Sequence, residues 1–499
     1  MRGKIVFDEK CRIEFDQLRN FFKTENKSIM FAKQYRYAAN PYTYCISPLG
    51  TYNIGQTIEF IEKCNQFGIN TEIEDKLKEQ IYPKLYINQI EQVPNSQYVY
   101  RDYQERLLQS LVMAGRGVIV SPTRSGKSLI LAGLCHNMLL NRNKNDIHNI
   151  LIIVPNIQLV SQMYNDFCEY GLNTKWNIIK FSAEQDKKNK KKNEEFKFND
   201  DNNIIISNSQ WLMIHGDEVP YIDCIIQDEC HGVKRSSELS KLVKSVKIPF
   251  KFGCTGTLPK EQIDRWNIAG IFGPVVDEIE IKELQEKKVL AEVSINPIKF
   301  VHSLKQNFKQ VNEDEIVDPF ELAQSEYKNE SMFLSQNEQT NKIITNIAKH
   351  IIIKHPNWNA LILFDYTLSG ESLFNLLDWK NKHYIDGKVI LDTRMDIVNQ
   401  MDDPNGGHIT VANCKCFGTG ITIKNIQCII LVTNQSAITK VIQAIGRGLR
   451  IEDKPVLYVF DIFHNYKYSE KHFKERTELY KQKYDKELNK DYKIKYVNL

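Results

Sequence analysis

Two series of short apolar segments restrict the fold of this 499-residue chain more than any other feature of its sequence. The segments are rich in valine and isoleucine, and stretches with helical character separate them. This pattern is typical of parallel sheets that are buried on both faces. The first series comprises residues 117–120, 150–154, 204–206, 224–226 and 252–254. The second comprises residues 360–364, 409–412, 428–432 and 456–460. We therefore predict an α/β fold in which two parallel-sheet lobes follow one another.

The regions before, between and after these series suggest a division into four parts. Residues 1–95 predict a small α+β domain, residues 96–285 the first lobe, residues 286–463 the second lobe, and residues 464–499 a basic helical tail. The linker between the lobes is expected near residues 285–292. Within the first part we expect strands at 5–7, 12–15, 29–37 and 42–46, and helices at 17–22 and 54–67.

Charge and cysteine usage exclude some classes of protein. The net charge is only +4, but nine Lys/Arg against five Asp/Glu in residues 1–50, and ten against six from His464 onwards, make both ends basic. Basic ends suit a phosphate backbone, and an ordinary solvated surface is the alternative. The 11 cysteines include no Cys-x-x-Cys pair, so a zinc site is not indicated. The charged N-terminus and the lack of a long apolar run lead us to expect a cytoplasmic protein without a membrane segment.

Residues 121–128, Ser-Pro-Thr-Arg-Ser-Gly-Lys-Ser, follow an apolar segment and precede a helical one, as a phosphate-binding loop does. Lys127 would supply charge to the phosphates, Ser128 a hydroxyl to Mg²⁺, and Gly126 a close backbone approach. The rest of the expected cradle is formed by Pro122, Thr123, Arg124 and Ser125. Ser121 replaces the usual first glycine, and the Gly-Lys-Ser triplet alone also arises by chance. The interpretation as a phosphate-binding loop therefore depends on further motifs elsewhere in the sequence.

An acidic pair, Asp228 and Glu229, ends the apolar segment 224–227, and Cys230 and His231 follow it. The carboxyl ends of strands in an open α/β sheet face the ligand crevice. Asp228 would then hold Mg²⁺, Glu229 would activate the attacking water, and His231 would link the nucleotide to a nucleic acid. The alternative is a pair of acids that begins a helix.

The segment Gln-Ala-Ile-Gly-Arg-Gly-Leu-Arg, from Gln443 to Arg450, lies in the second lobe. Arg447 and Arg450 are three residues apart, so a helix would present both on one face. Guanidinium groups suit the charge that develops on a transferred phosphoryl group, which makes this pair candidate arginine fingers. A surface helix with ordinary ion pairs is the alternative.

These three motifs in this order resemble the superfamily 2 helicases, which implies that both lobes are RecA-like and close on ATP. The resemblance implies that Arg101 and Gln104, upstream of the loop, contact adenine, and that Gly420 contacts the nucleotide. It also implies nucleic-acid contacts for the residues of the further motifs. These are Pro155, Asn156, Gln210, Thr255, Thr257, Gly418 and Thr419. Gly256 replaces the alanine that is usual between the two threonines, and residues 361–365 resemble motif IV.

More narrowly, the chain resembles the UvsW family of T-even phage helicases. That family pairs a small N-terminal nucleic-acid-binding domain with two helicase lobes and a short tail. The matching features are residues 34–37 around Arg36, residues 384–387, and the C-terminal sequence Tyr-Val-Asn-Leu. The resemblance implies an ATP- and Mg²⁺-dependent DNA helicase that acts on junctions, forks and R-loops in recombination, replication and repair, with strand annealing. For residues 35–37 a packed strand is the alternative to nucleic-acid binding.

Three other functions fit parts of the sequence. An RNA helicase uses the same motor, although its common box is Asp-Glu-Ala-Asp. A restriction-type translocase would carry a nuclease or methylase domain, for which no segment outside the motor is large enough. A nucleic-acid annealing or binding protein without ATPase activity would not need Lys127, Glu229 or Arg450. We expect DNA and RNA–DNA hybrids as partners, a monomer, and the host cytoplasm as the location if the chain is phage-encoded.

Overall fold

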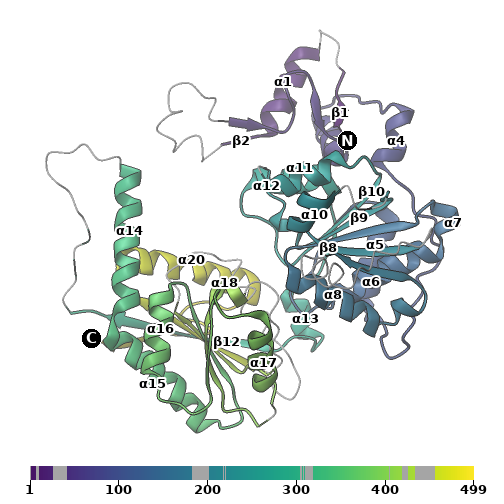
Figure 1. The fold of residues 1–499 in the computed structure, drawn as a ribbon. Helices are drawn as coiled ribbons and strands as arrows, with labels where there is room; N and C mark the ends of the chain where they lie inside the picture. The colour runs from purple at the N-terminus through teal and green to yellow at the C-terminus, as the bar shows by residue number, and fades with distance from the viewer. Residues whose placement is uncertain are drawn as a thin grey trace. The chain divides into compact units, whose positions relative to one another are not determined.

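The computed structural model describes residues 2–6, 11–25, 42–181, 202–216, 219, 221–235, 237–303, 306, 308, 319–403, 405–417, 425–432 and 456–499 (Figure 1). It forms two compact units: the first comprises Met1–Pro122 and Gly126–Ile279, and the second comprises Thr123–Ser125 and Glu280–Leu499. Among the described helices, none combines the length and apolar character that crossing a membrane requires.

The first unit is built on a parallel sheet of seven strands within the described residues. In sheet order they are β11 (Val275–Glu278), β5 (Gly117–Val120), β10 (Phe250–Thr255), β9 (Cys224–Asp228), β6 (Asn149–Val154), β8 (Asn203–Asn208) and β7 (Asn177–Phe181). The central strands are buried at almost every position, as their apolar sequences predict. The strands β7 and β11, which the sequence analysis did not predict, lie at the two edges and are partly exposed.

Helices cover both faces of this sheet (Figure 1). One apolar cluster joins alternate strand residues to the face formed by α10 (Ser209–His215), α11 (Glu238–Ser245) and α12 (Gln262–Phe272). The opposite face carries α5 (Asp102–Ala114), α6 (Lys127–Leu140) and α8 (Ile157–Glu169). The remaining short helices are α7 (Arg142–Asn145) and the 3₁₀ turns η4 (Leu172–Thr174) and η6 (Cys230–Gly232). The helix α6 is buried from Leu129 to Leu139 on all sides, and its residues there are apolar except for His136 and Asn137.

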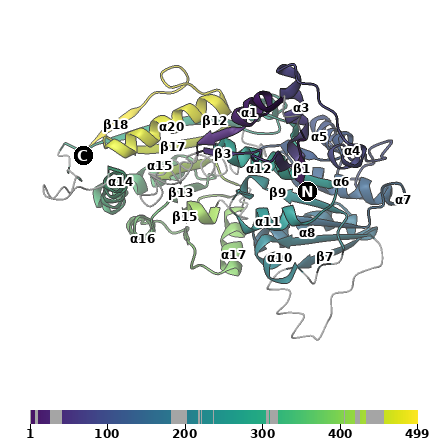
Figure 2. The same cartoon turned by 90° about the horizontal axis from the view of Figure 1, so that it is seen from above.

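The N-terminal region belongs to the same compact unit as the first lobe. It contains β1 (Arg2–Lys4), α1 (Arg12–Phe21), β2 (Lys23–Glu25), β3 (Tyr42–Tyr44), β4 (Thr51–Asn53), η3 (Ile54–Gln56), α3 (Thr57–Gln66) and α4 (Asp75–Ile81). Two antiparallel pairs form, β1 with β4 and β2 with β3. The apolar core of the region includes Trp266 of α12, and η3 and β4 contact that helix, so the region lies against one side of the first lobe (Figures 1 and 2).

The predicted strand at 12–15 is wrong, because these residues form the first turn of α1. Phe15, Leu18 and Phe22 recur at helical spacing and are all buried, so one face of α1 packs into the core. The predicted helix at 54–67 is confirmed as η3 followed by α3, and the predicted strand at 42–46 is confirmed in part as β3. The predicted strand at 29–37, with Arg36, lies outside the described residues.

The second unit has its own parallel sheet of seven described strands. In sheet order they are β14 (Lys382–Ile385), β15 (Ile409–Asn413), β13 (Ala360–Phe364), β16 (Cys428–Val432), β17 (Val456–His464), β12 (Glu292–Val301) and β18 (Lys495–Asn498). The helices are α13 (Ile281–Glu286), α14 (Pro319–Gln336), α15 (Glu338–Lys354), α16 (Thr367–Leu376), α17 (Leu391–Met401), α18 (Cys414–Phe417) and α20 (Lys467–Tyr484). The two sheets confirm the predicted α/β class with two parallel-sheet lobes.

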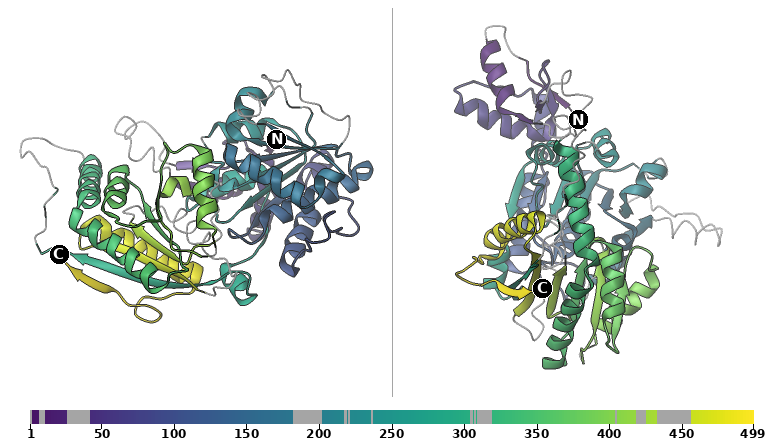
Figure 3. Two further views of the ribbon diagram at one scale, coloured as in Figure 1. Left: turned by 60° about the horizontal axis from the view of Figure 1, so that its bottom comes forward. Right: turned by 90° about the vertical axis from the view of Figure 1, so that its left-hand side faces the viewer.

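The prediction that residues 464–499 form a helical tail is only partly correct, because the chain is helical in α20 but not after it. After α20 the chain forms β18, which pairs in parallel with β12 and completes the edge of the second sheet (Figure 3). The helix α20 also packs against the sheet, since Arg476 lies fully buried beside Asp461 of β17. The tail is therefore part of the second lobe rather than an appendage to it.

A buried histidine of this sheet makes the stability of the second lobe dependent on pH. His464 Nδ1 lies 3.0 Å from His302 Nε2, and burial, with a smaller effect from His302, lowers the pKa of His464 from 6.5 to about 3. The folded state keeps His464 neutral where the unfolded chain takes up a proton, so stability falls as the pH decreases from about 6.5 towards 3. Thermal unfolding between pH 7 and 5 should show a smaller decrease for His464→Gln than for the wild type. The exposed His350→Gln variant should leave the wild-type decrease unchanged, and an identical pH dependence in all three proteins would contradict the prediction.

Candidate active site

The predicted phosphate loop connects β5 to α6, so its last residues lie at the N-terminus of a buried helix. Gly126 precedes this helix with φ +80°, and a Cβ there would lie 2.2 Å from Gln104 Nε2. Ser121 N donates to Thr255 O at 2.8 Å, which ties the loop to the end of β10. Pro122, Thr123, Arg124 and Ser125 form the turn between these points, and Arg124 also has a positive φ of 69°. A loop with a left-handed glycine at a helix N-terminus fits a bound phosphate chain.

Gly126→Ala should therefore weaken nucleotide binding. A left-handed conformation costs an L-residue about 1–2 kcal/mol, and the new methyl group would clash with Gln104. We expect a loss of about tenfold or more in affinity for a fluorescent ATP analogue, measured by equilibrium titration. Gly216→Ala is the matched control because its Cβ would meet open space and its φ is not positive. Equal affinities for the two variants would contradict this account of the loop.

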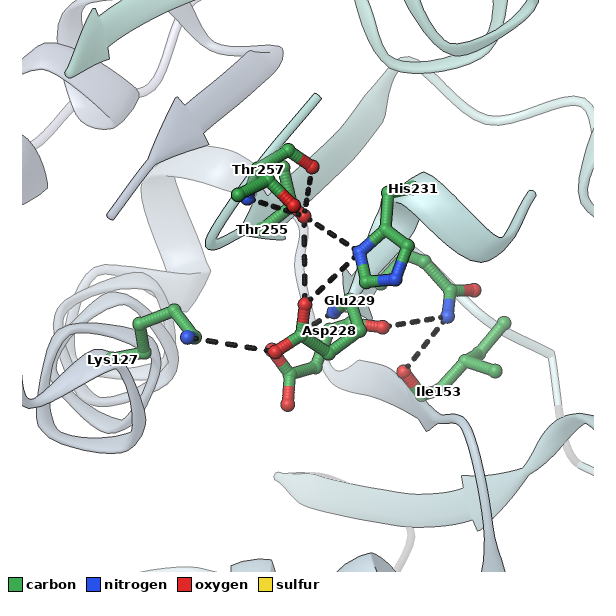
Figure 4. Close-up of polar contacts among 8 residues, drawn as sticks. Lys127, Ile153, Asp228, Glu229, His231, Thr255 and Thr257 are labelled. Atoms are coloured by element: carbon green, nitrogen blue, oxygen red, sulfur yellow. Dashed lines mark hydrogen bonds and ion pairs between the residues drawn. The ribbon is translucent and has the colours of Figure 1, made fainter. Parts of the chain in front are cut away.

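Lys127 and Glu229 bring the two predicted halves of the site together. Lys127 Nζ lies 3.5 Å from Glu229 Oε1, across the gap between the start of α6 and the end of β9 (Figure 4). Burial lowers the pKa of Lys127, but Glu229 together with Cys254 and Asp228 outweighs this effect, so the pKa is raised. The lysine therefore remains a cation at the point where the phosphate loop opens.

The two carboxyl groups of the acidic pair have opposite electrostatic environments. Burial raises the pKa of Asp228 to about 6, with a further contribution from the Glu229 charge. Burial would also raise the pKa of Glu229, yet Lys127 and His231 together lower it to about 2. Glu229 is thus held as a carboxylate, and Asp228 is a buried group that a nearby cation would ionise.

A hydrogen-bonded cluster continues from Glu229 to the end of β10 (Figure 4). His231 Nδ1 lies 3.1 Å from Glu229 Oε2 and 2.8 Å from the Thr255 hydroxyl. The same hydroxyl lies 2.9 Å from Thr257 O. The predicted motif containing Thr255 and Thr257 is therefore in direct contact with the acidic pair. Thr255 is fully buried, and its hydroxyl lies 3.4 Å from Glu229 Oε2. In this position the hydroxyl faces the acidic pair and not the surface where a nucleic acid would bind.

The donors expected for Mg²⁺ are Asp228 and Ser128, and an aspartate with a hydroxyl next to phosphate oxygens suits this ion. In this structure the Ser128 hydroxyl lies 2.9 Å from the Tyr170 hydroxyl, a contact that the sequence analysis missed. The side chains are 42 residues apart in the sequence, and no local pattern signals their proximity. Within the described part of the chain, no cluster of three or more histidine, cysteine or acidic residues suggests a different metal site.

Arg101 and Gln104, the predicted adenine contacts, begin α5 next to the phosphate loop. Arg101 N donates to Gln104 Oε1 at 2.9 Å, which caps the helix, and Gln104 Nε2 faces Gly126. Gln104 is buried, whereas Arg101 is exposed. The structure thus brings this pair to the loop, and adenine recognition stays a prediction.

The predicted nucleic-acid contacts of the first lobe lie at the carboxyl ends of its strands. Pro155 and Asn156 follow β6, and Asn156 Oδ1 accepts from Leu159 N at 3.0 Å to cap α8. Gln210 is exposed on α10, directly after β8. The structure places them at the carboxyl ends of neighbouring β-strands, and their contacts with a nucleic acid stay a prediction.

Several predicted site residues lie outside the described residues. They are Arg36, Gly418, Thr419, Gly420, Gln443, Arg447 and Arg450. Their roles therefore stay predictions from the sequence. The segment that resembles motif IV forms β13 and its end, as expected for a motif at a strand terminus.

Comparison with known proteins agrees with this geometry. Residues 97–260 match the model of the type III restriction enzyme res subunit, and residues 341–452 match the helicase conserved C-terminal domain. The ATP-dependent DNA helicase uvsW of Enterobacteria phage T4 is 27% identical over 468 residues, which cover 90% of this chain and 86% of uvsW. Putative helicase 22 of Sulfolobus islandicus filamentous virus is 23% identical over 394 residues, which cover 73% of this chain and 64% of that protein.

A solved structure supports the fold. The ATP-dependent type ISP restriction-modification enzyme LlaBIII bound to DNA has a TM-score of 0.55 and 12% identity, and the match covers 80% of this chain and 31% of the enzyme. The two matched domains span the lobes that carry the phosphate loop and the second parallel sheet. By its two matched domains the chain is therefore a helicase, and it is similar to the ATP-dependent DNA helicase uvsW of phage T4.

Proposed function

We propose that this chain is an ATP- and Mg²⁺-dependent DNA helicase and translocase that acts on branched DNA, with strand annealing as a second activity. The observation that carries the proposal is the continuous contact from Lys127 through Glu229 and His231 to Thr255. This series of contacts connects the phosphate loop to the carboxyl end of β10, on the side of the sheet where the predicted nucleic-acid contacts lie. The resemblance to a DNA helicase over nine-tenths of the chain supports DNA as the substrate.

The residues of the site suggest how the chain promotes hydrolysis. Bound Mg–ATP supplies the phosphoryl group and a divalent charge. Lys127 lies 3.5 Å from Glu229, and together with His231 it lowers the pKa of Glu229 to about 2, so that Glu229 is a carboxylate. Lys127 would hold the phosphates and Asp228 with Ser128 would hold Mg²⁺, while Glu229, as a carboxylate, would accept a proton from the attacking water. His231 and Thr255 then hold the carboxylate in orientation.

The same contacts would couple ATP hydrolysis to the bound nucleic acid. A change in the protonation or position of Glu229 alters its contacts with His231 and Thr255, and Thr255 is in turn bonded to Thr257 O. Movement of this segment would reach the loop after β10. The predicted role of Arg447 and Arg450 is to stabilise developing charge from the second lobe.

The test is a panel of labelled substrates: forked DNA, a Holliday junction, an R-loop and an RNA duplex, each with and without ATP. We expect ATP-dependent separation of the branched DNA substrates and little separation of the RNA duplex. Preference for the RNA duplex would replace the proposal by an RNA helicase. Annealing without any ATP-dependent separation would indicate a nucleic-acid annealing protein instead. Glu238→Gln, a change of an exposed glutamate on α11, should behave as the wild type throughout.

A further inference from the structure

A cavity of about 470 Å³ lies between the N-terminal region and the helices α11 and α12 of the first lobe. Its wall contains none of the residues of the phosphate loop or the acidic pair. Its volume is in the range of sites that hold a small ligand. The cavity is therefore separate from the candidate active site, although its wall and the Lys127–Glu229 pair belong to the same compact unit.

Positive charge reaches this cavity from three separate segments. Arg19 comes from α1, Arg235 from the turn before α11, and Lys244 from α11 itself, and no aspartate or glutamate is among the described lining residues. Arg19 is fixed by a hydrogen bond of 3.1 Å from Nε to Ile46 O. Lys244 Nζ lies 2.6 Å from Asn267 Oδ1. Three cations held around one cavity without a lining carboxylate are suited to a phosphate group.

The rest of the wall offers aromatic surface and an unsatisfied amide. The Arg19 guanidinium lies 3.9 Å from the centroid of the Tyr44 ring, and Trp266 lines the cavity as well. The Gln56 side chain is only 1% exposed, and among the described residues its Nε2 meets no oxygen or nitrogen acceptor and has only a weak contact with the Cys45 sulfur. It lies beside the Cys45 thiol, which burial keeps neutral by raising its pKa to about 12. A buried amide donor costs free energy unless a ligand satisfies it, and an unstacked base offers both acceptors and a face for aromatic rings.

We propose that this cavity binds one unstacked nucleotide of a nucleic-acid strand, with its phosphate held by Arg19, Arg235 and Lys244 and its base between Tyr44 and Gln56. The inference rests on the proposed function, because strand separation is what supplies unstacked nucleotides. Arg235 follows His231 by four residues. A nucleic-acid strand bound in the cavity would therefore contact the segment 231–235, which directly follows the acidic pair.

The first test is the affinity of the full chain for a labelled 20-nucleotide single strand, measured by fluorescence anisotropy without ATP. Arg235→Glu should weaken binding by about fivefold or more, because it removes one phosphate contact and adds a repulsive charge. Lys234→Glu is the matched control, since it changes the charge equally at the adjacent exposed residue that does not line the cavity. Equal losses for the two variants would overturn the proposal, because they would show a general charge effect.

The second test locates the base and does not depend on the charge variants. A single strand that contains one 5-iodouracil should cross-link to the peptides that carry Tyr44 or Trp266, and Arg235→Glu should reduce this cross-link. Excess unlabelled strand should prevent it, whereas inorganic phosphate and free thymidine monophosphate should not. Cross-links only elsewhere would overturn the assignment, and equal competition by the free nucleotide would show a small-molecule site instead.

These outcomes separate the cavity from the proposed function. Both binding tests are made without ATP, so a chain that binds the strand in the cavity but separates no duplex loses only the proposed function. A chain that separates branched DNA while Arg235→Glu and Lys234→Glu bind the strand alike loses only the cavity proposal.

Discussion

Replacement of Glu229 by glutamine is expected to lower kcat for ATP hydrolysis by about 10²–10⁴-fold, the range that a positioned general base contributes. The amide keeps the shape of the side chain but cannot accept a proton from water. It also removes the negative charge 3.5 Å from Lys127, so the lysine remains available to phosphate and nucleotide binding should be kept or strengthened. The measurement is steady-state ATP hydrolysis with saturating forked DNA, together with equilibrium binding of a fluorescent ATP analogue.

Glu238→Gln provides the control for this variant, because Glu238 is an exposed glutamate of the same lobe that pairs only at the surface with Lys241. Its kcat should equal that of the wild type. If Glu229→Gln bound the analogue normally and retained wild-type hydrolysis, Glu229 would not be the base, and the roles of the acidic pair would have to be reassigned.

Arg476→Ala is expected to destabilise the second lobe by about 3–5 kcal/mol, as the removal of one partner from a buried ion pair does. The Arg476 and Asp461 side chains are 1% and 0% exposed, and Arg476 Nη2 lies 2.8 Å from Asp461 Oδ1. Nε of Arg476 donates to the other carboxylate oxygen at 2.9 Å, and the Tyr480 hydroxyl donates to it at 2.7 Å. Without the arginine, the buried carboxylate would keep the neutral tyrosine as its one side-chain partner among the described residues. Thermal and urea unfolding of the full chain would measure the loss.

Two further variants distinguish the ion pair from a general effect of substitution in α20. Lys474→Ala removes an exposed cation from the same helix and should change stability little. The double variant Asp461→Leu/Arg476→Met removes both charges and should recover part of the stability, since no unpaired charge remains buried. Stability of Arg476→Ala close to that of the wild type would show that Asp461 is protonated or hydrated in the folded chain.

The sequence predicted the centre of each lobe better than its edges. The central strands β6, β8 and β9 are continuous apolar segments because helices cover both faces of the sheet. The edge strands β7 and β11 have charged residues and partial exposure, so their sequences resemble loops. The order of the strands, and the addition of β18 beside β12, depend on pairings between distant segments that no local pattern records.

The candidate site shows the same distinction. Lys127, Asp228 and Glu229 were predictable because motif chemistry and strand ends identify them, and the structure brings Lys127 and Glu229 within 3.5 Å. The contact of Ser128 with Tyr170 was not predictable, since it depends on how α6 and α8 pack. Charge in the tail suggested a surface for a phosphate backbone or for solvent, whereas Arg476 is buried because Asp461 lies beneath α20.

The most direct test of the account is the rate of ATP hydrolysis, with and without forked DNA, for the wild type and for Lys127→Ala. The account predicts that forked DNA stimulates hydrolysis by the wild type and that Lys127→Ala shows no hydrolysis above background under either condition. Lys241→Ala, which removes an exposed lysine of the same lobe, should be stimulated like the wild type. DNA-stimulated hydrolysis that is unchanged in Lys127→Ala would contradict the claim that this chain is an ATP-driven motor with its phosphate loop at residues 121–128.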